Sequence, residues 1–132
     1  MSKREENLAV YLVGSIGYGA CEILWRGFTH WTMLLTGGFC FLSLYRMDRR
    51  CKRLPLPRKC VRGALFITGV EFFAGLLINR AAKLQVWDYS SLPFNVLGQI
   101  CLPYSILWFF LCFPLFKLSG LLSRTLTQKK RA

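Results

Sequence analysis

Acidic residues and histidine are scarce in this chain of 132 residues, which has 6 Asp and Glu and 1 His against 18 Lys and Arg. A small soluble protein with this balance would suggest nucleic-acid binding. Hydrophobic residues make up 54% of the sequence, however, and the basic residues lie between long apolar runs. This segregation favours a membrane protein and argues against a nucleic-acid partner.

Recognisable catalytic motifs are also lacking. The sequence has no phosphate-binding Gly-rich loop, no His-Glu-x-x-His and no Gly-x-Ser-x-Gly. We therefore expect no catalytic residue, no ATP hydrolysis by the chain and no cofactor, although an integral membrane enzyme stays open as an alternative. Cys51 and Cys60 have no second pair of thiols, so no metal site is predicted. None of the six cysteines falls in an expected outer loop, so no disulfide framework is implied.

Four apolar runs are long enough, or nearly long enough, to cross a membrane. They predict spans at about residues 7–25, 28–45, 63–79 and 95–116, with a basic linker at 46–62 and an outer loop at 80–94. The first run is not expected to be a secretory signal, because Glu5 and Glu6 stand before it and a second apolar run follows at once. The predicted fold is a single all-α integral membrane domain with four transmembrane helices in two antiparallel hairpins.

The positions of the basic residues predict the orientation of these spans. Fifteen of the 18 Lys and Arg lie at the N-terminus, in the linker and in the C-terminal tail, and the other three are Arg26, Arg80 and Lys83. Because Lys and Arg are enriched in cytoplasmic segments, both termini and the linker are expected inside the cell. The basic inner face is expected to contact anionic lipid headgroups. A bacterial inner membrane is the expected location.

Glu22 and Glu71 are the only acids within the predicted spans. A carboxylate at membrane depth has to be paired, protonated or directed into a wet cavity, and a functional role is the default interpretation. Arg26 is a candidate partner for Glu22, because it follows four residues later on the same helix face. Glu71 shares its face with Thr68 and Gly75.

The fourth run adds Gln99 and Ser105, with Pro103 between them. A proline there is expected to free a backbone carbonyl in the middle of the membrane. The sequence thus predicts a polar cluster open to the outer side, and its candidate substrate-binding residues are Glu22, Arg26, Glu71, Asp88, Gln99 and Ser105. For Gln99 and Ser105 the preferred interpretation is that they join helices by hydrogen bonds.

The connection Val86–Asn95 is unusually polar for its surroundings. Trp87 and Tyr89 are expected at the level of the lipid headgroups. Asp88 can close a local turn, and Asn95 is placed to cap the fourth helix. If this connection is only a turn, Asp88→Asn should spare folding. If Asp88 makes a charge-dependent contact, for example with an outer arginine, folding should fail.

The stretch Trp87–Trp108 resembles a signature of the CmpB-like putative ABC-transporter type IV membrane protein family. The matching residues are Trp87, Asp88, Tyr89, Ser90, Pro93, Phe94, Asn95, Gly98, Ile100, Cys101, Leu102, Ser105 and Trp108. The first hairpin is similar more loosely, because GYGACEILW resembles a Gly-x-x-x-Glu helix, whereas TGGFCF lacks both prolines of the family's Gly-Pro-x-Cys-Pro element. The resemblance implies a small multi-span membrane protein and transport, but no particular substrate.

Several functions compete at this point. A transporter or permease-like subunit would bind its substrate at the polar cluster, and it would need a homodimer, other membrane subunits or an ATPase partner, because four spans enclose little space. A scaffold or accessory protein would instead bind a membrane partner through its helices. A proton-coupled exporter would use one of the two intramembrane acids, although the strong charge bias fits small multidrug exporters poorly.

Overall fold

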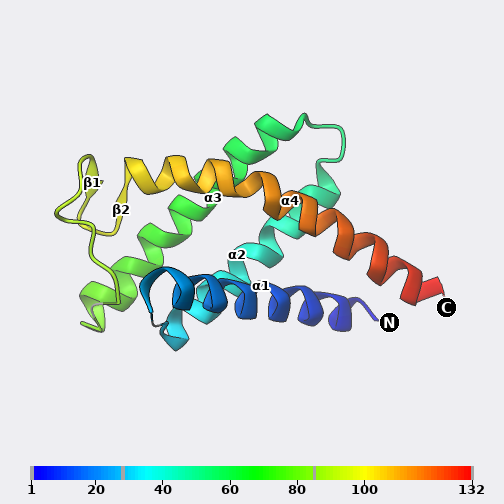
Figure 1. Cartoon of the computed structure of the whole chain (residues 1–132), viewed down its shortest axis with the longest axis horizontal. Helices are drawn as coiled ribbons and strands as arrows, with labels where there is room; N and C mark the ends of the chain where they lie inside the picture. The colour runs from blue at the N-terminus through cyan, green and yellow to red at the C-terminus, as the bar shows by residue number, and fades with distance from the viewer. Residues whose placement is uncertain (1, 28, 85, 132) are drawn as a thin grey trace. The chain divides into compact units, whose positions relative to one another are not determined.

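The computed structural model describes residues 2–27, 29–84 and 86–131, with side chains described as far as Leu126 (Figure 1). The helices are α1 (Lys3–Arg26), α2 (Trp31–Arg50), α3 (Leu56–Gly75) and α4 (Leu102–Arg131). A π-helical segment, η1 (Leu76–Ala81), continues α3, and a short antiparallel ladder of β1 (Asn95–Val96) and β2 (Ile100–Cys101) precedes α4. The fold is therefore all-α apart from this ladder. Phe28, the predicted start of the second span, lies outside the described residues.

Three helical segments are long and apolar enough to cross a membrane, namely Lys3–Arg26, Leu56–Ala81 and Leu102–Leu126. The remaining helix, α2, is not among them. Only 15 residues, Trp31–Tyr45, precede its first charged residue, Arg46. Such a stretch is about 22 Å long at ~1.5 Å per residue, which is shorter than a hydrocarbon core of about 30 Å. The last five residues of α2 include four charged ones, Arg46, Asp48, Arg49 and Arg50, so the helix cannot extend its apolar length there. The predicted span over residues 28–45 therefore stays a prediction.

The chain forms two compact units. The first unit contains the residues up to Leu54 together with those from Pro114 onward, and the second unit contains Pro55–Phe113. Helix α4 contributes to both, and Pro114 lies inside it at the boundary.

Within the first unit, α1 and α2 form an antiparallel hairpin with a short connection. Helix α1 begins with a capping box, in which Ser2 Oγ accepts from the Glu5 N–H and the Ser2 N–H donates to Glu5 Oε2. It ends at Gly27, whose φ of 83° is the left-handed conformation that glycine adopts readily. His30 then caps α2 by accepting a hydrogen bond from the Thr32 N–H through Nδ1.

Glycines allow α1 and α2 to approach closely. A β-carbon on Gly14 would lie 2.4 Å from Cβ of Phe41, and one on Gly37 would lie 2.7 Å from Cβ of Tyr18. Larger residues at these positions would push the helices apart. The buried core of this unit consists of Val10, Phe41, Tyr45 and Leu126. The last part of α4 therefore packs on the hairpin.

Within the second unit, one face of α3 and η1 is buried at successive turns. This face is formed by Cys60, Ala64, Ile67, Glu71, Gly75 and Asn79. The hydroxyl oxygens of Thr68 in α3 and Ser105 in α4 lie 2.9 Å apart, so they join the two helices. Figure 1 shows the connection from η1 through β1 and β2 to the start of α4.

Two sequence predictions about the fourth helix are wrong. The helix begins at Leu102, so Asn95 lies in β1 and does not cap it. Pro103 is the second residue of α4, and a proline in the first turn removes no helical hydrogen bond. Hydropathy alone could not locate this helix start, because the residues before it are uncharged and mostly apolar as well.

Candidate functional site

Two buried amide side chains, Asn79 of η1 and Gln99, hold the connection to α4. Asn79 Nδ2 donates to Gln99 Oε1 at 2.8 Å. Asn79 Oδ1 accepts from the backbone N–H groups of Val86 and Trp87, at 2.7 and 3.3 Å. Gln99 Nε2 donates to the Leu97 carbonyl at 2.9 Å. Both amides thus pair backbone groups that belong to no helix or ladder, and burial of such groups requires a partner.

Trp87 packs within this connection. Its side chain is buried, and its indole Nε1 donates to the Gln99 carbonyl at 2.9 Å. A β-carbon on Gly75 would lie 3.1 Å from Cζ2 of Trp87, so the indole contacts the end of α3. The ring and the N–H group of Trp87 are thus both used inside the fold, and its depth at the level of the lipid headgroups stays a prediction.

Asp88 closes a turn, as predicted. Its Oδ1 accepts from the Ser90 N–H at 2.9 Å, and the Tyr89 N–H donates to the Gly98 carbonyl at 2.7 Å. Gly98 has a φ of 73°, and a β-carbon there would lie 2.8 Å from Asp88 Oδ1. Hydrogen bonds from the Ser90 side chain and backbone lower the pKa of the exposed Asp88 carboxyl. The Tyr89 ring stacks on Tyr104 of α4 with 4.7 Å between centroids.

Asn95 organises the same connection rather than a helix. Its Nδ2 donates to the carbonyls of Ser90 and Leu92, at 3.2 and 2.9 Å, and its Oδ1 accepts from the Gly98 N–H at 3.2 Å. Pro93 lies between these partners, and its ring restricts the backbone of the residue before it. Hydrogen bonds thus give Trp87, Asp88, Asn95 and Gly98 of the signature a structural role.

Glu71 lies on the buried face of α3, with 9% of its surface exposed. Gly75 follows one helical turn later on the same face, and Gln99 packs against it. Thr68 lies about one turn before Glu71 on α3, and its hydroxyl group bonds to that of Ser105. Along α3, Glu71 therefore lies between a hydrogen bond, Thr68 to Ser105, and a packing contact, Gly75 with Gln99. Ser105 joins α3 and α4 through this bond, and its candidacy for substrate binding stays a prediction.

Glu22 and Arg26 form the predicted ion pair, with 3.2 Å between Oε2 and Nη1. They belong to the first unit. The other candidate residues, Glu71, Asp88, Gln99 and Ser105, belong to the second unit. A single polar cluster built from all six therefore stays a prediction.

A further buried carboxylate, that of Glu6, was not predicted from the sequence. Glu6 is 4% exposed, and the Tyr45 hydroxyl donates to its Oε1 at 2.7 Å. Arg49 Nη1 donates to the same oxygen, and nearby the buried Ser119 hydroxyl donates to Asp48 Oδ2 at 3.1 Å. Glu6 follows other charged residues at the N-terminus, which suggested a solvated position. Only the antiparallel pairing of α1 and α2 brings it to Tyr45 and Arg49.

The described residues also bear on metal binding. Within residues 2–27, 29–84 and 86–131, no group of three or more His, Cys, Asp or Glu side chains could hold a metal ion. Cys51 is partly exposed in the first unit, whereas Cys60 is buried in the second. These positions give the weak thiol pair considered above no additional support.

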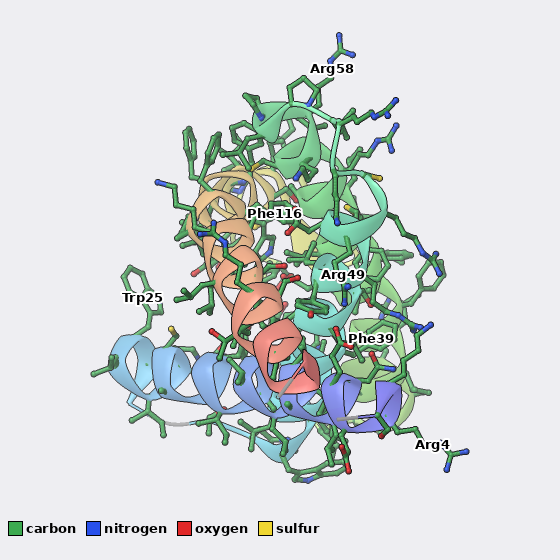
Figure 2. All side chains as sticks on the ribbon, turned by 90° about the vertical axis from the view of Figure 1, so that its right-hand side faces the viewer. Arg4, Trp25, Phe39, Arg49, Arg58 and Phe116 are labelled. Atoms are coloured by element: carbon green, nitrogen blue, oxygen red, sulfur yellow. The ribbon has the colours of Figure 1, made fainter. Side chains whose placement is uncertain are left out.

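Large apolar side chains are exposed along α1, α3 and α4. Leu24 and Trp25 are 87% and 78% exposed, and Figure 2 shows Trp25 pointing away from α1. Leu65 and Phe73 are similarly exposed on α3. Soluble monomers rarely expose so much apolar surface, and lipid chains would cover it in a membrane. Together with the three apolar segments, this surface defines an all-α membrane protein that contacts the bilayer.

Comparison with protein families identifies the chain further. The family described as "Putative ABC-transporter type IV" matches residues 12–131. The chain belongs to this family, which confirms the resemblance carried by the Trp87–Trp108 signature. No solved structure matches the chain.

Proposed function

We propose that this chain is a permease-like membrane subunit that uses Glu71 in transport. The observation that carries the proposal is the burial of this carboxyl group in the middle of Leu56–Ala81, a segment apolar enough to cross a membrane. An ionisable residue at such a position is costly, and it usually marks an ion or substrate pathway. The family membership agrees with a role in transport.

The surroundings of Glu71 suit a cation or a proton. Thr68 and Ser105 supply hydroxyl groups on one side of it, and Gln99 packs on Gly75 on the other. These groups are neutral, and a carboxylate attracts a bound cation strongly in a low-dielectric environment. A protonated amine, a metal cation or a proton is therefore the substrate class that we propose.

We further propose four crossings, with both termini in the cytoplasm of a bacterial cell. Fifteen of the 18 Lys and Arg would then lie inside, where they can contact anionic lipids. The short α1–α2 connection supports a return of α2 through the membrane, because the two helices are antiparallel. In Figure 2, Arg58 at the start of α3 points away from its helix, as a basic anchor would.

Thiol labelling tests this topology. Ser91→Cys, in the exposed connection before α4, should react with a membrane-impermeant maleimide in spheroplasts. Cys51, in the basic linker, should react only after the membrane is permeabilised. Reaction of both thiols, or of Cys51 alone, in intact spheroplasts would overturn the proposed orientation.

The chain has no recognisable ATP-binding motif, so we propose that it works with a partner. The partner would be an ATPase subunit, other membrane subunits or a second copy of the chain. Gentle purification followed by mass spectrometry and determination of the oligomeric state would distinguish these possibilities. We expect a stoichiometric ATPase or a homodimer, and a solitary monomer in lipid would argue against the permease-like role.

Transport itself is tested in proteoliposomes that contain the chain and any partner purified with it. Efflux of a panel of amines and monovalent cations, with an internal pH indicator, would reveal both cation and proton movement. We expect Glu71→Gln to abolish the transport found and Glu22→Gln to retain it, because Glu22 belongs to the other compact unit and forms an ion pair within its own helix. Unchanged transport with Glu71→Gln would remove this residue from the mechanism.

A scaffold is the second candidate, and one observation favours it. The amides of Asn79, Asn95 and Gln99 each form hydrogen bonds within the connection itself, so they have a structural role there. A scaffold would need only the rigid loop that results. It would be supported by stable capture of a membrane partner together with the absence of transport in the same preparation.

A further inference from the structure

An uncharged segment extends well beyond α4 on its N-terminal side. Asp88 is the last charged residue before the helix and Lys117 is the next, so residues 89–116 carry no charge. Helix α4 begins only at Leu102. The uncharged helical part, residues 102–116, is about 22 Å long at ~1.5 Å per residue, whereas a hydrocarbon core is about 30 Å thick. The rest of the hydrocarbon thickness has to be crossed by the non-helical residues before Leu102 or by residues beyond Lys117.

The residues just before α4 form a hairpin with an apolar tip. Phe94, Val96 and Leu97 are 78%, 48% and 55% exposed. Phe94 and Leu97 both have a φ of 55°, a conformation that bulky residues rarely adopt. Such backbone persists only where the surrounding structure imposes it. The fold therefore holds Phe94 and Leu97 outward against a local conformational preference, and Val96 is exposed between them.

The same connection also exposes polar side chains, namely Asp88, Ser90 and Ser91. It is thus amphipathic, because it exposes a carboxylate and two hydroxyl groups as well as three large apolar side chains.

Many backbone carbonyls of the hairpin have partners within the connection. Asn95 Nδ2 bonds to the carbonyls of Ser90 and Leu92, and Gln99 Nε2 bonds to that of Leu97. The Val96, Gly98 and Gln99 carbonyls accept from the Gln99 N–H, the Tyr89 N–H and the Trp87 indole, respectively. Non-helical backbone can approach a membrane interior only if its polar groups have partners within the protein.

We propose that the tip formed by Phe94, Val96 and Leu97 inserts into the bilayer at the boundary between headgroups and acyl chains, while Asp88, Ser90 and Ser91 stay in the headgroup layer. The occupant of this surface is lipid because the tip continues the exposed apolar surface of Leu102 and Ile106 at the start of α4, a segment apolar enough to cross the membrane. Amphipathic elements reach about 5–10 Å into this boundary region.

The insertion is tested by thiol accessibility in nanodiscs of phosphatidylcholine and phosphatidylglycerol, which leave both membrane faces open. The parent protein carries Cys21→Ser and Cys51→Ser, because the other four cysteines are buried. The probe is Val96→Cys, and the matched control is Ala82→Cys, which is exposed at the other end of the same connection between Arg80 and Lys83. Neither position has a positive φ.

We expect a sulfonated maleimide to label the probe at least about tenfold more slowly than the control, because the thiolate is the reactive species and an apolar environment disfavours it. Both thiols should react alike after denaturation in SDS. A bimane attached to Val96→Cys should be quenched by lipids with a nitroxide at a shallow acyl position.

Equal labelling of probe and control would overturn the proposal, because it would place the tip in water. A protected thiol without quenching by nitroxide lipids would also overturn it, because protein would then cover the tip. This proposal concerns only the position of the tip in the membrane and does not depend on transport. A chain that transports nothing, or in which Glu71→Gln has no effect, leaves this test unchanged.

Discussion

Gly75 of α3 and Gln99 before β2 are in direct contact: a β-carbon on Gly75 would lie 2.4 Å from Gln99 Oε1 and 2.9 Å from Gln99 Cβ. Through this contact, the signature segment that begins at Trp87 packs on the end of α3, one helical turn from Glu71. It depends on the absence of a side chain at residue 75, because Gln99 is also fixed by Asn79 and by the Leu97 carbonyl.

Gly75→Ala is expected to destabilise the protein by about 1–3 kcal/mol, because the added methyl group overpacks a buried contact. Gly69→Ala is the matched control in the same helix, since a β-carbon at residue 69 would have no neighbour within 4 Å. It should be neutral or stabilising by up to about 1 kcal/mol. Unfolding in mixed micelles, followed by tryptophan fluorescence, measures both. If the Gly75→Ala cost were unchanged in a Gln99→Ala background, Gln99 would not be its cause.

Asn79→Ala is expected to loosen the connection that leads to α4. The substitution removes the acceptor of the buried Val86 N–H, and an unpaired buried donor costs about 1–3 kcal/mol. Hydrogen exchange should show reduced protection at the amides of Val86 and Trp87, with less change in the middle of α3. Ser91→Ala, at an exposed position of the same connection, should leave protection unaltered. Equal protection in Asn79→Ala and the native chain would contradict the assigned hydrogen bonds.

Arg49→Ala is expected to cost about 1–3 kcal/mol, because it leaves the buried Glu6 carboxylate without its cation. This figure lies below the loss for a fully buried pair, since 40% of the Arg49 side chain is exposed. Arg50→Ala removes an exposed neighbour and should change stability by less than about 0.5 kcal/mol. A double-mutant cycle with Glu6→Gln measures the coupling. Additive effects would show that Glu6 and Arg49 do not stabilise each other.

Asp88 should make the turn sensitive to acid. Its pKa in the folded state is lowered from the ordinary value of 3.8 by hydrogen bonds from the Ser90 side chain and backbone. The stabilisation is therefore fully present above that ordinary value and is lost as the pH falls through the lower folded-state pKa. The amide resonance of Ser90 should titrate with a midpoint below 3.8 in the native chain.

Asp88→Asn should abolish this titration and retain the fold, because an amide oxygen can accept the same bond at 2.9 Å from the Ser90 nitrogen. Failure of Asp88→Asn to fold would reveal a requirement for the negative charge. A native titration midpoint above 3.8 would contradict the direction of the pKa shift.

Local chemistry made several features predictable from the sequence. The ion pair of Glu22 with Arg26 follows from their spacing by one helical turn, and the turn at Asp88 follows from its side chain's preference for nearby N–H groups. The bond between Ser105 and Thr68 was only partly predictable. Residue type indicated a helix-joining role for Ser105, whereas its partner depends on how α3 and α4 meet.

Other features could not be read from the sequence, because they depend on contacts between distant residues. Asn95 looked like a helix cap, since capping residues commonly precede a helix, but its side chain pairs with Ser90, Leu92 and Gly98. The residue type of Trp87 indicated no packing partner, whereas the structure shows that Gly75 leaves room for its indole on α3.

Composition and charge by themselves determined that this is an all-α membrane protein, because apolar runs of this length are stable where lipid surrounds them. The tertiary structure decided which polar side chains are bound within the fold and which apolar side chains stay exposed. It commits Asn79, Asn95 and Gln99 to the connection before α4, buries Glu6 against Arg49, and leaves Phe94, Val96 and Leu97 exposed. The physical reason is that a buried polar group must find a partner, and only the fold determines which partner is within reach.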